Sequence, residues 1–207
     1  MTAPAIDVEA PVWPTLAIGE EGPTFGGLLG TDRLRHGFSC VTERDILVLV
    51  FTSNRCPTAK AYAGRLNALQ AEYGPRGVQV VAINSNDPHL YPDERFERMV
   101  ERAAEDGYRF PYLVDDGQAV ARAYGAQCTF HLFVLDRGRR LRYQGRFDDS
   151  RFEASARSHD LLDALDDILT GGDVRVPATR PFGCSLDFVS TGGQAHDGDR
   201  HGEDDDD

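Results

Sequence analysis

One cysteine stands where a strongly apolar run gives way to a helix-like pattern, in the stretch VFTSNRCPTAKAY over residues 50–62. A thiol becomes a good nucleophile only as the thiolate, and a free thiol titrates near ~8.5. The unpaired N–H groups of a first helical turn, with Arg55 and Lys60 as nearby cations, can lower the pKa of Cys56. This position predicts a redox-active thiolate. A remnant nucleophile with little activity and a buried structural thiol are the alternatives.

Dithiol exchange needs a second sulfur, and the residue three positions before Cys56 is a serine. The Ser53 hydroxyl is not redox-active, but it can donate a hydrogen bond to a Cys56 thiolate, and it can equally cap the helix. Cys40, Cys128 and Cys184 are scattered along the chain without any C-x-x-C spacing. This scatter argues against a structural zinc site and against a secreted disulfide framework.

The residues around Cys56 predict a strand followed by a helix. DILVLVF, residues 45–51, is a short continuous apolar run rich in branched side chains, which is typical of a strand buried on both faces. Over residues 57–73 apolar side chains recur at three- and four-residue spacing, which predicts a helix that the following Gly-Pro pair ends. Cys56 is therefore expected at the junction of a central strand and a helix.

The rest of the chain continues the alternation of strands and helices. The patterns predict a strand at 78–85, a strand or extended segment at 112–115, and helices at 91–107, 117–125 and 158–172. Strands 131–136 and 140–145 are expected to form a hairpin. The irregular lead is expected to contain a short hairpin near residues 15–18 and 25–29. Ser158 is expected to cap the last helix. Early βα units imply parallel strands and the late hairpin adds antiparallel ones. The sequence therefore favours an α/β fold with a mixed central β-sheet flanked by helices on both faces.

Length and charge limit what the chain can be. Its 207 residues with 41% hydrophobic content suit one domain, expected at 16–189 after an irregular lead at 1–15. The formal net charge of −12 disfavours a nucleic-acid or anionic-membrane role. The Gly- and Asp-rich residues 190–207 predict a disordered acidic tail. No signal peptide, membrane-spanning segment, metal site or organic cofactor is indicated, so a cytoplasmic location is the default expectation.

Six segments, in order, resemble the thioredoxin-fold redoxins, in particular their peroxiredoxin-like AhpC/TSA-type branch. The segments are SNRCPTAKAY (53–62), VVAINSND (80–87), YPDERFERM (91–99), FPYLVDDGQAVARAYGAQCT (110–129), LRYQGRFDD (141–149) and GCSLDF (183–188). The resemblance implies a thioredoxin-like fold. Two positions depart from it: Ser53 stands where the branch has the first cysteine of a dithiol pair, and Phe130 stands where it usually has a cis-proline. Both departures weaken the implied dithiol exchange and leave the implied fold intact.

The resemblance also implies roles for single residues. The spacing S-x-x-C is similar to the peroxiredoxin element in which a hydroxyl steers peroxide onto the thiolate, although Leu49 stands where that element has a proline. The loop that holds Cys128 and Thr129 is implied to pack against the start of the active helix. Cys128 can then resolve an oxidised Cys56, and Cys184 is a second candidate.

Structural interpretations stand beside these roles. Core packing is favoured for Cys128, and an anchoring role in the last segment for Cys184. Arg146 is a candidate cation for the thiolate, but a structural ion-pair group with Asp148 and Asp149 is favoured for it.

The favoured hypothesis is a thiol-based oxidoreductase of the redoxin class that reduces a peroxide or a disulfide. The candidate site residues are Cys56, Ser53, Cys128, Arg55 and Thr129. The partners expected are that substrate and an unidentified thiol electron donor, and a homodimer stays open. A second hypothesis is a catalytically decayed thioredoxin-fold module used for binding or scaffolding, and a third keeps dithiol chemistry through a Cys56–Cys128 disulfide.

Overall fold

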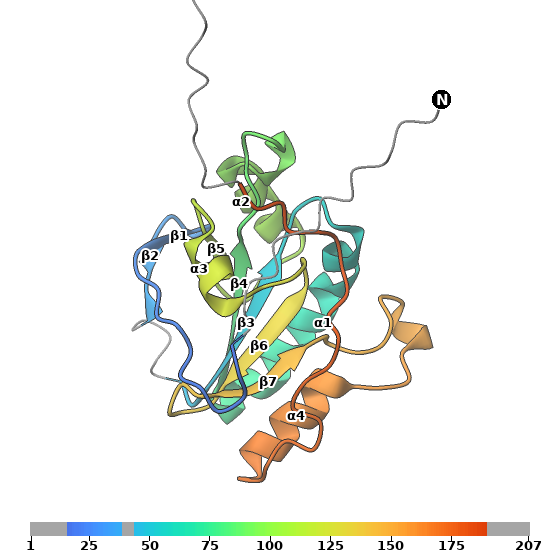
Figure 1. Ribbon diagram of the computed structural model, residues 1–207. Helices are drawn as coiled ribbons and strands as arrows, with labels where there is room; N and C mark the ends of the chain where they lie inside the picture. Colours follow the sequence, from blue (N-terminus) through green and yellow to red (C-terminus); the bar gives the residue numbers. More distant parts are fainter. Residues whose placement is uncertain (1–15, 39–43, 190–207) are drawn as a thin grey trace, which may run out of the picture.

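The computed structural model describes residues 16–38 and 44–189, which build one seven-stranded sheet (Figure 1). The strands are β1 (Leu28–Gly30), β2 (Arg35–His36), β3 (Ile46–Thr52), β4 (Val78–Asn84), β5 (Tyr112–Val114), β6 (His131–Leu135) and β7 (Leu141–Gly145). The helices are α1 (Pro57–Tyr73), α2 (Phe96–Glu105), α3 (Ala119–Tyr124) and α4 (Asp160–Leu169), with short 3-10 turns η2 (Gly74–Arg76), η3 (Pro92–Glu94) and η4 (Glu153–Ser155). The predicted lead at 1–15, the predicted tail at 190–207 and Cys40 lie outside the described residues.

The strand order β2-β1-β5-β4-β3-β6-β7 places β3 near the middle of the sheet. Strand β3 pairs in parallel with β4, to which α1 leads, and antiparallel with β6. Every residue of β3 is buried, as expected for a strand that is covered on both faces. The predicted mixed sheet and late hairpin are confirmed, because β4 pairs with β5 in parallel and β6 pairs with β7 antiparallel.

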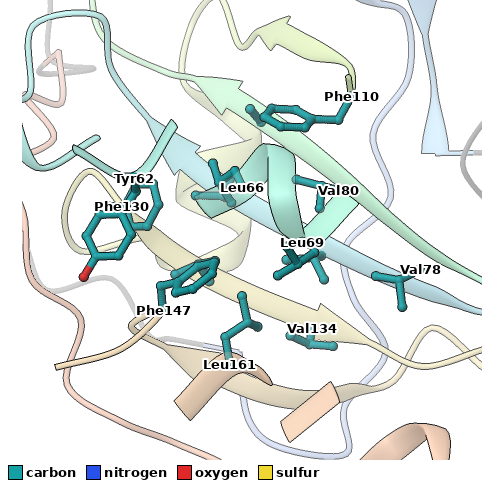
Figure 2. Close-up of a cluster of buried hydrophobic side chains, with 14 of the residues drawn as sticks. Tyr62, Leu66, Leu69, Val78, Val80, Phe110, Phe130, Val134, Phe147 and Leu161 are labelled. Atoms are coloured by element: carbon teal, nitrogen blue, oxygen red, sulfur yellow. The ribbon is translucent and has the colours of Figure 1, made fainter. Parts of the chain in front are cut away.

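Alternate side chains of the central strands point into two separate cores. Helices α1, α2 and α4 cover one face, where Tyr62, Leu66 and Leu69 of α1 meet Val80 of β4 and Val134 of β6 (Figure 2). Helix α3 covers the other face. Full burial of one such aliphatic or aromatic side chain stabilises the fold by about 1.5–3 kcal/mol relative to exposure. Helices therefore pack on both faces of the sheet, as predicted. This packing buries β3 and sets the position at which α1 begins.

The hairpin predicted near the N-terminus is wrong in position. The structure pairs Leu28 with His36 rather than 15–18 with 25–29. The reason lies in the turn between β1 and β2, where the Asp32 carboxyl group accepts the Leu34 N–H at 3.0 Å and contacts His36 Nε2 at 2.8 Å. An aspartate that bonds its own backbone two residues on is a strong turn former.

Two helix starts also differ from prediction. The helix expected at 91–107 is divided, because Arg95 is extended and separates η3 from α2. Ser158 does not cap α4: the N-cap is His159, and the Ser158 hydroxyl donates to Asp160 at 2.7 Å. None of the described helices is long and apolar enough to cross a membrane.

After α4 the chain runs back along the sheet toward the end where α1 begins (Figure 1). Ala178 forms a parallel bridge with Gln144 of β7, and Ser185 forms an antiparallel bridge with Cys128. Leu186 is buried in the core on the α3 face. These contacts bring the last described segment to the loop that precedes β6.

Candidate active site

Cys56 caps the start of α1. Its backbone is extended, with φ −64° and ψ 118°, and its sulfur accepts the N–H of Ala59 at 3.5 Å. The sulfur therefore takes the place of the side-chain oxygen found at most helix N-caps, at the positive end of the helix. Cys56 is only 1% exposed. The predicted junction of strand and helix is confirmed, and it surrounds the sulfur with backbone donors.

A buried carboxyl group holds the loop before α1. Ser53 donates its hydroxyl proton to Glu94 Oε1 at 2.5 Å. The backbone N–H groups of Asn54 and Arg55 reach the same carboxyl group at 2.8 and 3.2 Å. Asn84, at the end of β4, donates to it at 2.9 Å. Glu94 is 3% exposed, and these donors offset the cost of removing its oxygens from water.

Ser53 holds the loop before α1 and is neither the helix cap, which is Cys56, nor a hydrogen-bond partner of the sulfur. Its oxygen accepts the N–H groups of Arg55 and Cys56 at 3.1 and 3.2 Å. A hydroxyl has one proton, and that proton goes to Glu94, so the hydrogen bond predicted from Ser53 to the Cys56 sulfur is not formed. Sequence reasoning missed Glu94, because its only signal was an acidic residue near the start of an expected helix.

The loop before β6 brings Thr129 to the sulfur. Thr129 is 1% exposed, and its hydroxyl donates to the Cys184 carbonyl at 3.2 Å and acts to lower the pKa of the nearby Cys56. Phe130 follows with a φ of +70°, a conformation that bulky residues rarely adopt and that costs on the order of 1–3 kcal/mol. Its ring stacks on Tyr62 with centroids 4.3 Å apart, which holds the strained residue in place (Figure 2). The described peptide bonds are all trans, so Phe130 occupies the expected cis-proline position without a cis bond.

Residues 183–186, which we call the C-terminal strap, pair with the loop that holds Thr129. The Thr129 N–H donates to the Cys184 carbonyl at 2.8 Å, and the Cys184 N–H donates to the Thr129 hydroxyl at 3.0 Å. Gly183 permits this approach, since a Cβ at that position would lie 1.8 Å from the Thr129 carbonyl oxygen. The strap thereby places Cys184 in the lining of the same cavity as Cys56, and each residue acts on the pKa of the other.

The three described thiols differ in proton affinity. Burial acts to raise the pKa of Cys56, but the hydrogen bonds that its sulfur accepts from Thr129, Ala59 and Cys184 outweigh burial and leave the pKa below the ordinary thiol value. Burial, followed by the hydrogen bond to Cys56 and its charge, raises the pKa of Cys184 to about 11. Burial raises the pKa of Cys128 to about 12. Cys56 is therefore the most readily ionised of the three described thiols, whereas Cys128 and Cys184 hold their protons more strongly.

A cavity of about 480 Å³ opens at Cys56. Arg55 and Tyr91 line it, with the Arg55 guanidinium 3.7 Å from the centre of the Tyr91 ring. Cys184 and Asp187 line it as well. A small molecule in this cavity meets the sulfur of lowered pKa, a guanidinium and a second thiol.

Other candidate features lie away from the sulfur. The Arg146 guanidinium donates to Asp160 at 2.8 Å, so it forms a structural ion pair as favoured, but with Asp160 in place of the predicted Asp148 and Asp149. A larger cavity of about 590 Å³ shares Glu94 with the site, and no described cysteine lines it. Over the described ranges, no group of three or more His, Cys, Asp or Glu side chains is arranged to hold a metal ion.

Comparison with known proteins gives one family match. The family model described as Redoxin matches residues 17–159, a range that includes Cys56 and Thr129 and ends before the C-terminal strap. The chain is also similar to a hypothetical protein from Sinorhizobium meliloti 1021 of solved structure, with 35% identity over 86% of this chain and 98% of that one and a TM-score of 0.79.

Two further similarities concern thiol-disulfide proteins. A solved Chlorobium tepidum structure, assigned as a thiol:disulfide interchange protein DsbE, has 24% identity over 75% of this chain and 99% of that one, with a TM-score of 0.61. This likeness shows the fold, and the thioredoxin-like fold implied by the resemblance is confirmed. The thiol-disulfide oxidoreductase ResA of Halalkalibacterium halodurans is 34% identical over 77 residues, which make up 37% of this chain and 40% of ResA.

Proposed function

Because the chain belongs to the Redoxin family, we propose that it is a thiol oxidoreductase whose nucleophile is the Cys56 thiolate. One observation carries the proposal: the Cys56 sulfur caps α1, accepts the Ala59 N–H and lines the 480 Å³ cavity, and the polar groups of Ala59, Thr129 and Cys184 act to lower its pKa. These donors hold the pKa of Cys56 below the ordinary thiol value. A lower pKa raises the fraction of thiolate at neutral pH, and the thiolate is the reactive form.

The substrate that we propose first is a small hydroperoxide. Cys56 is 1% exposed, and Cys184 of the strap lines the cavity through which the sulfur is approached. A small oxidant enters such a cavity without displacing the strap, whereas a protein disulfide does not. The Arg55 guanidinium lines the same cavity and favours the negative charge that develops on the leaving oxygen.

The reaction is a two-electron oxidation of the sulfur. The Cys56 thiolate attacks the terminal oxygen of the hydroperoxide, so that an S–O bond forms as the O–O bond breaks. Cys56 becomes a sulfenic acid, and the leaving alkoxide or hydroxide takes a proton from water to give an alcohol or water. An external thiol must then return Cys56 to the reduced state.

A low-molecular-weight disulfide is the second candidate substrate. The observation that favours it is the 34% identity with ResA, a protein described as a thiol-disulfide oxidoreductase, over 77 residues. In this reaction the Cys56 thiolate attacks one sulfur of the disulfide. A mixed S–S bond forms as the substrate S–S bond breaks, and the other half of the substrate leaves as a thiolate.

Oxidant consumption tests the proposal. Reduced protein is mixed with hydrogen peroxide, and separately with oxidised glutathione, in the presence of dithiothreitol as electron donor. Cys56→Ser is expected to abolish consumption of the true substrate. Cys128→Ser is the matched control and is expected to remain active, because Cys128 is a protonated thiol that is absent from the described residues lining the cavity.

The pH dependence of Cys56 alkylation separates an active site from a decayed binding module. Peptide-level mass spectrometry follows the labelling of Cys56 alone, and we expect half-maximal labelling well below the free-thiol value of ~8.5. Half-maximal labelling near ~8.5, together with no consumption of either oxidant, would contradict the proposal and favour the decayed module.

A further inference from the structure

Cys184 is a second thiol in the cavity of Cys56, and the strap that carries it is firmly placed. Main-chain and hydroxyl hydrogen bonds of 2.8 and 3.0 Å join Cys184 to Thr129. Beyond it, Ser185 bridges Cys128, and Leu186 is 6% exposed in the core on the α3 face. The contacts on both sides of residue 184 thus hold Cys184 in the cavity that Cys56 also lines.

We propose that Cys184 is the resolving thiol of this site and that each turnover passes through a disulfide between Cys56 and Cys184. The oxidation of Cys56 rests on the proposed function, whereas the choice of Cys184 rests on the strap. Ser53 supplies no sulfur three residues before Cys56, and the strap brings one from the other end of the domain. The Redoxin family model ends at residue 159, so it assigns no role to Cys184, which the sequence left as the second candidate after Cys128.

The chemical step balances without any further reactant. Cys184 attacks the sulfur of the Cys56 sulfenic acid, so an S–S bond forms as the S–O bond breaks. The hydroxide that leaves combines with the proton of the Cys184 thiol to give water. The two-electron oxidation is then shared between the two sulfurs of the disulfide, and a dithiol reductant returns both to thiols. With a disulfide substrate, Cys184 attacks the mixed disulfide on Cys56 and releases the second half of the substrate as a thiol.

The charges of the site support this order of events. In the reduced protein the charge of Cys56 helps to hold the pKa of Cys184 at about 11, so Cys184 stays a proton donor. A sulfenic acid on Cys56 carries no charge, so the charge of Cys56 no longer raises the pKa of Cys184. The positive charge of Arg55, which acts to lower the pKa of Cys184, then favours ionisation of the attacking thiol.

Cys128 fits the resolving role less well. Burial raises its pKa to about 12, and within the described part of the chain it is not among the residues that line the cavity. Its backbone serves instead to dock the strap through the bridge to Ser185. Cys128 is half-buried and belongs to neither hydrophobic core, so the structure does not bear out the core packing favoured for it from sequence.

The test oxidises reduced protein with one equivalent of hydrogen peroxide and maps the products by mass spectrometry under non-reducing conditions. Wild type and Cys128→Ser are expected to contain a Cys56–Cys184 disulfide. Cys184→Ser is expected to accumulate a sulfenic acid on Cys56, with labelling by dimedone about tenfold above wild type. A Cys56–Cys128 disulfide, or a sulfenic acid that persists in wild type as it does in Cys184→Ser, overturns the proposal.

Equilibration in a glutathione redox buffer tests the pairing without peroxide. If peroxide leaves Cys56 unchanged but the buffer yields the Cys56–Cys184 disulfide, the peroxidase function fails and the pairing stands. If glutathione stays attached to Cys56 in wild type to the same extent as in Cys184→Ser, the pairing is wrong whatever the substrate.

A backbone variant tests the strap with every cysteine in place. Gly183→Ala puts a Cβ 1.8 Å from the Thr129 carbonyl oxygen and must move the strap, whereas Gly64→Ala is a matched control with no neighbour within 4 Å of its new Cβ. We expect Gly183→Ala to slow formation of the Cys56–Cys184 disulfide about tenfold and Gly64→Ala to leave it unchanged. An equal rate in Gly183→Ala and wild type would show that docking of the strap does not bring the two sulfurs together.

Discussion

The charge state of Cys56 depends on donors from three separate parts of the chain. Ala59 belongs to the first turn of α1, Thr129 to the loop before β6, and Cys184 to the C-terminal strap. Burial opposes ionisation of a thiol, so a sulfur that is 1% exposed without these donors would have a raised pKa. The reactivity proposed for Cys56 therefore depends on tertiary structure more than on the helix alone.

Thr129→Val tests this dependence. Valine has nearly the shape of threonine and lacks the hydroxyl, so the variant removes the hydroxyl's lowering effect on the pKa of Cys56 together with its two hydrogen bonds to the Cys184 main chain. A hydrogen bond to a charged group contributes about 1.5–3 kcal/mol, and the pKa of Cys56 is expected to rise by about one unit or more. The measurement is the pH dependence of Cys56 alkylation. Thr129→Ser keeps the hydroxyl and is expected to restore the lower pKa.

Ser53→Ala is the matched control for the same measurement. The Ser53 proton goes to Glu94 and not to the sulfur, so its removal is expected to shift the pKa of Cys56 by less than Thr129→Val does. A larger shift in Ser53→Ala would show that Ser53 is the donor that resemblance to peroxiredoxins suggested. Comparison of the two variants therefore shows which hydroxyl lowers the pKa of Cys56.

At the scale of elements, β6 begins with a histidine that cannot carry its charge. His131 is 2% exposed, burial lowers its pKa to about 3, and its Nδ1 accepts the Gln127 N–H at 3.3 Å. The pKa of His131 is lower in the folded state than in the unfolded state. The stability that the neutral side chain contributes is therefore fully present above pH ~6.5 and is lost as the pH falls from ~6.5 toward ~3. The start of β6, which also positions Thr129, is thus expected to be sensitive to acid.

Urea unfolding at pH 7 and pH 5 measures this effect. Between pH ~6.5 and pH 5, His131 takes up a proton in the unfolded chain but stays neutral in the folded chain. This difference lowers the free energy of unfolding by about 2 kcal/mol. His131→Gln keeps a hydrogen-bond acceptor and does not titrate, so its loss of stability over the same interval is expected to be smaller by about that amount. Equal losses in the two proteins would mean that His131 is not neutral and buried in solution.

The elements around Cys56 were predictable because their signals are local. The apolar run before it and the three- and four-residue spacing after it specified β3 and α1, and the resemblance implied that Thr129 would lie nearby. Glu94 and the contact of Cys184 with Cys56 were not predictable in this way. Each depends on where a distant segment returns to the sheet, and neither the hydrogen bonds of Glu94 nor the bridge at Ser185 leaves a periodic pattern in the sequence.

On the scale of the whole molecule, the chain after α4 connects the last helix to the start of the first one and ends in the C-terminal strap. It runs from α4 past β7, where Ala178 bridges Gln144, to the loop before β6, where Ser185 bridges Cys128 and Leu186 is buried (Figure 1). A disulfide between Cys56 and Cys184 would add a covalent bond to the noncovalent contacts that hold the C-terminal strap near the start of α1. The redox state of the site and the stability of the domain are then linked.

Oxidised protein is accordingly expected to unfold at a higher denaturant concentration than reduced protein. The disulfide would close a loop of roughly 130 residues, and the chain-entropy model predicts a gain of about 4–5 kcal/mol for a loop of that size. The measurement is guanidinium unfolding of wild type and Cys128→Ser, each in both redox states, with the disulfide verified by mass spectrometry. Cys184→Ser, treated with the same oxidant, is expected to show no gain. A lower midpoint in verified oxidised protein would mean that bond formation pulls Cys184 away from Thr129, and that the strap opens when the site is oxidised.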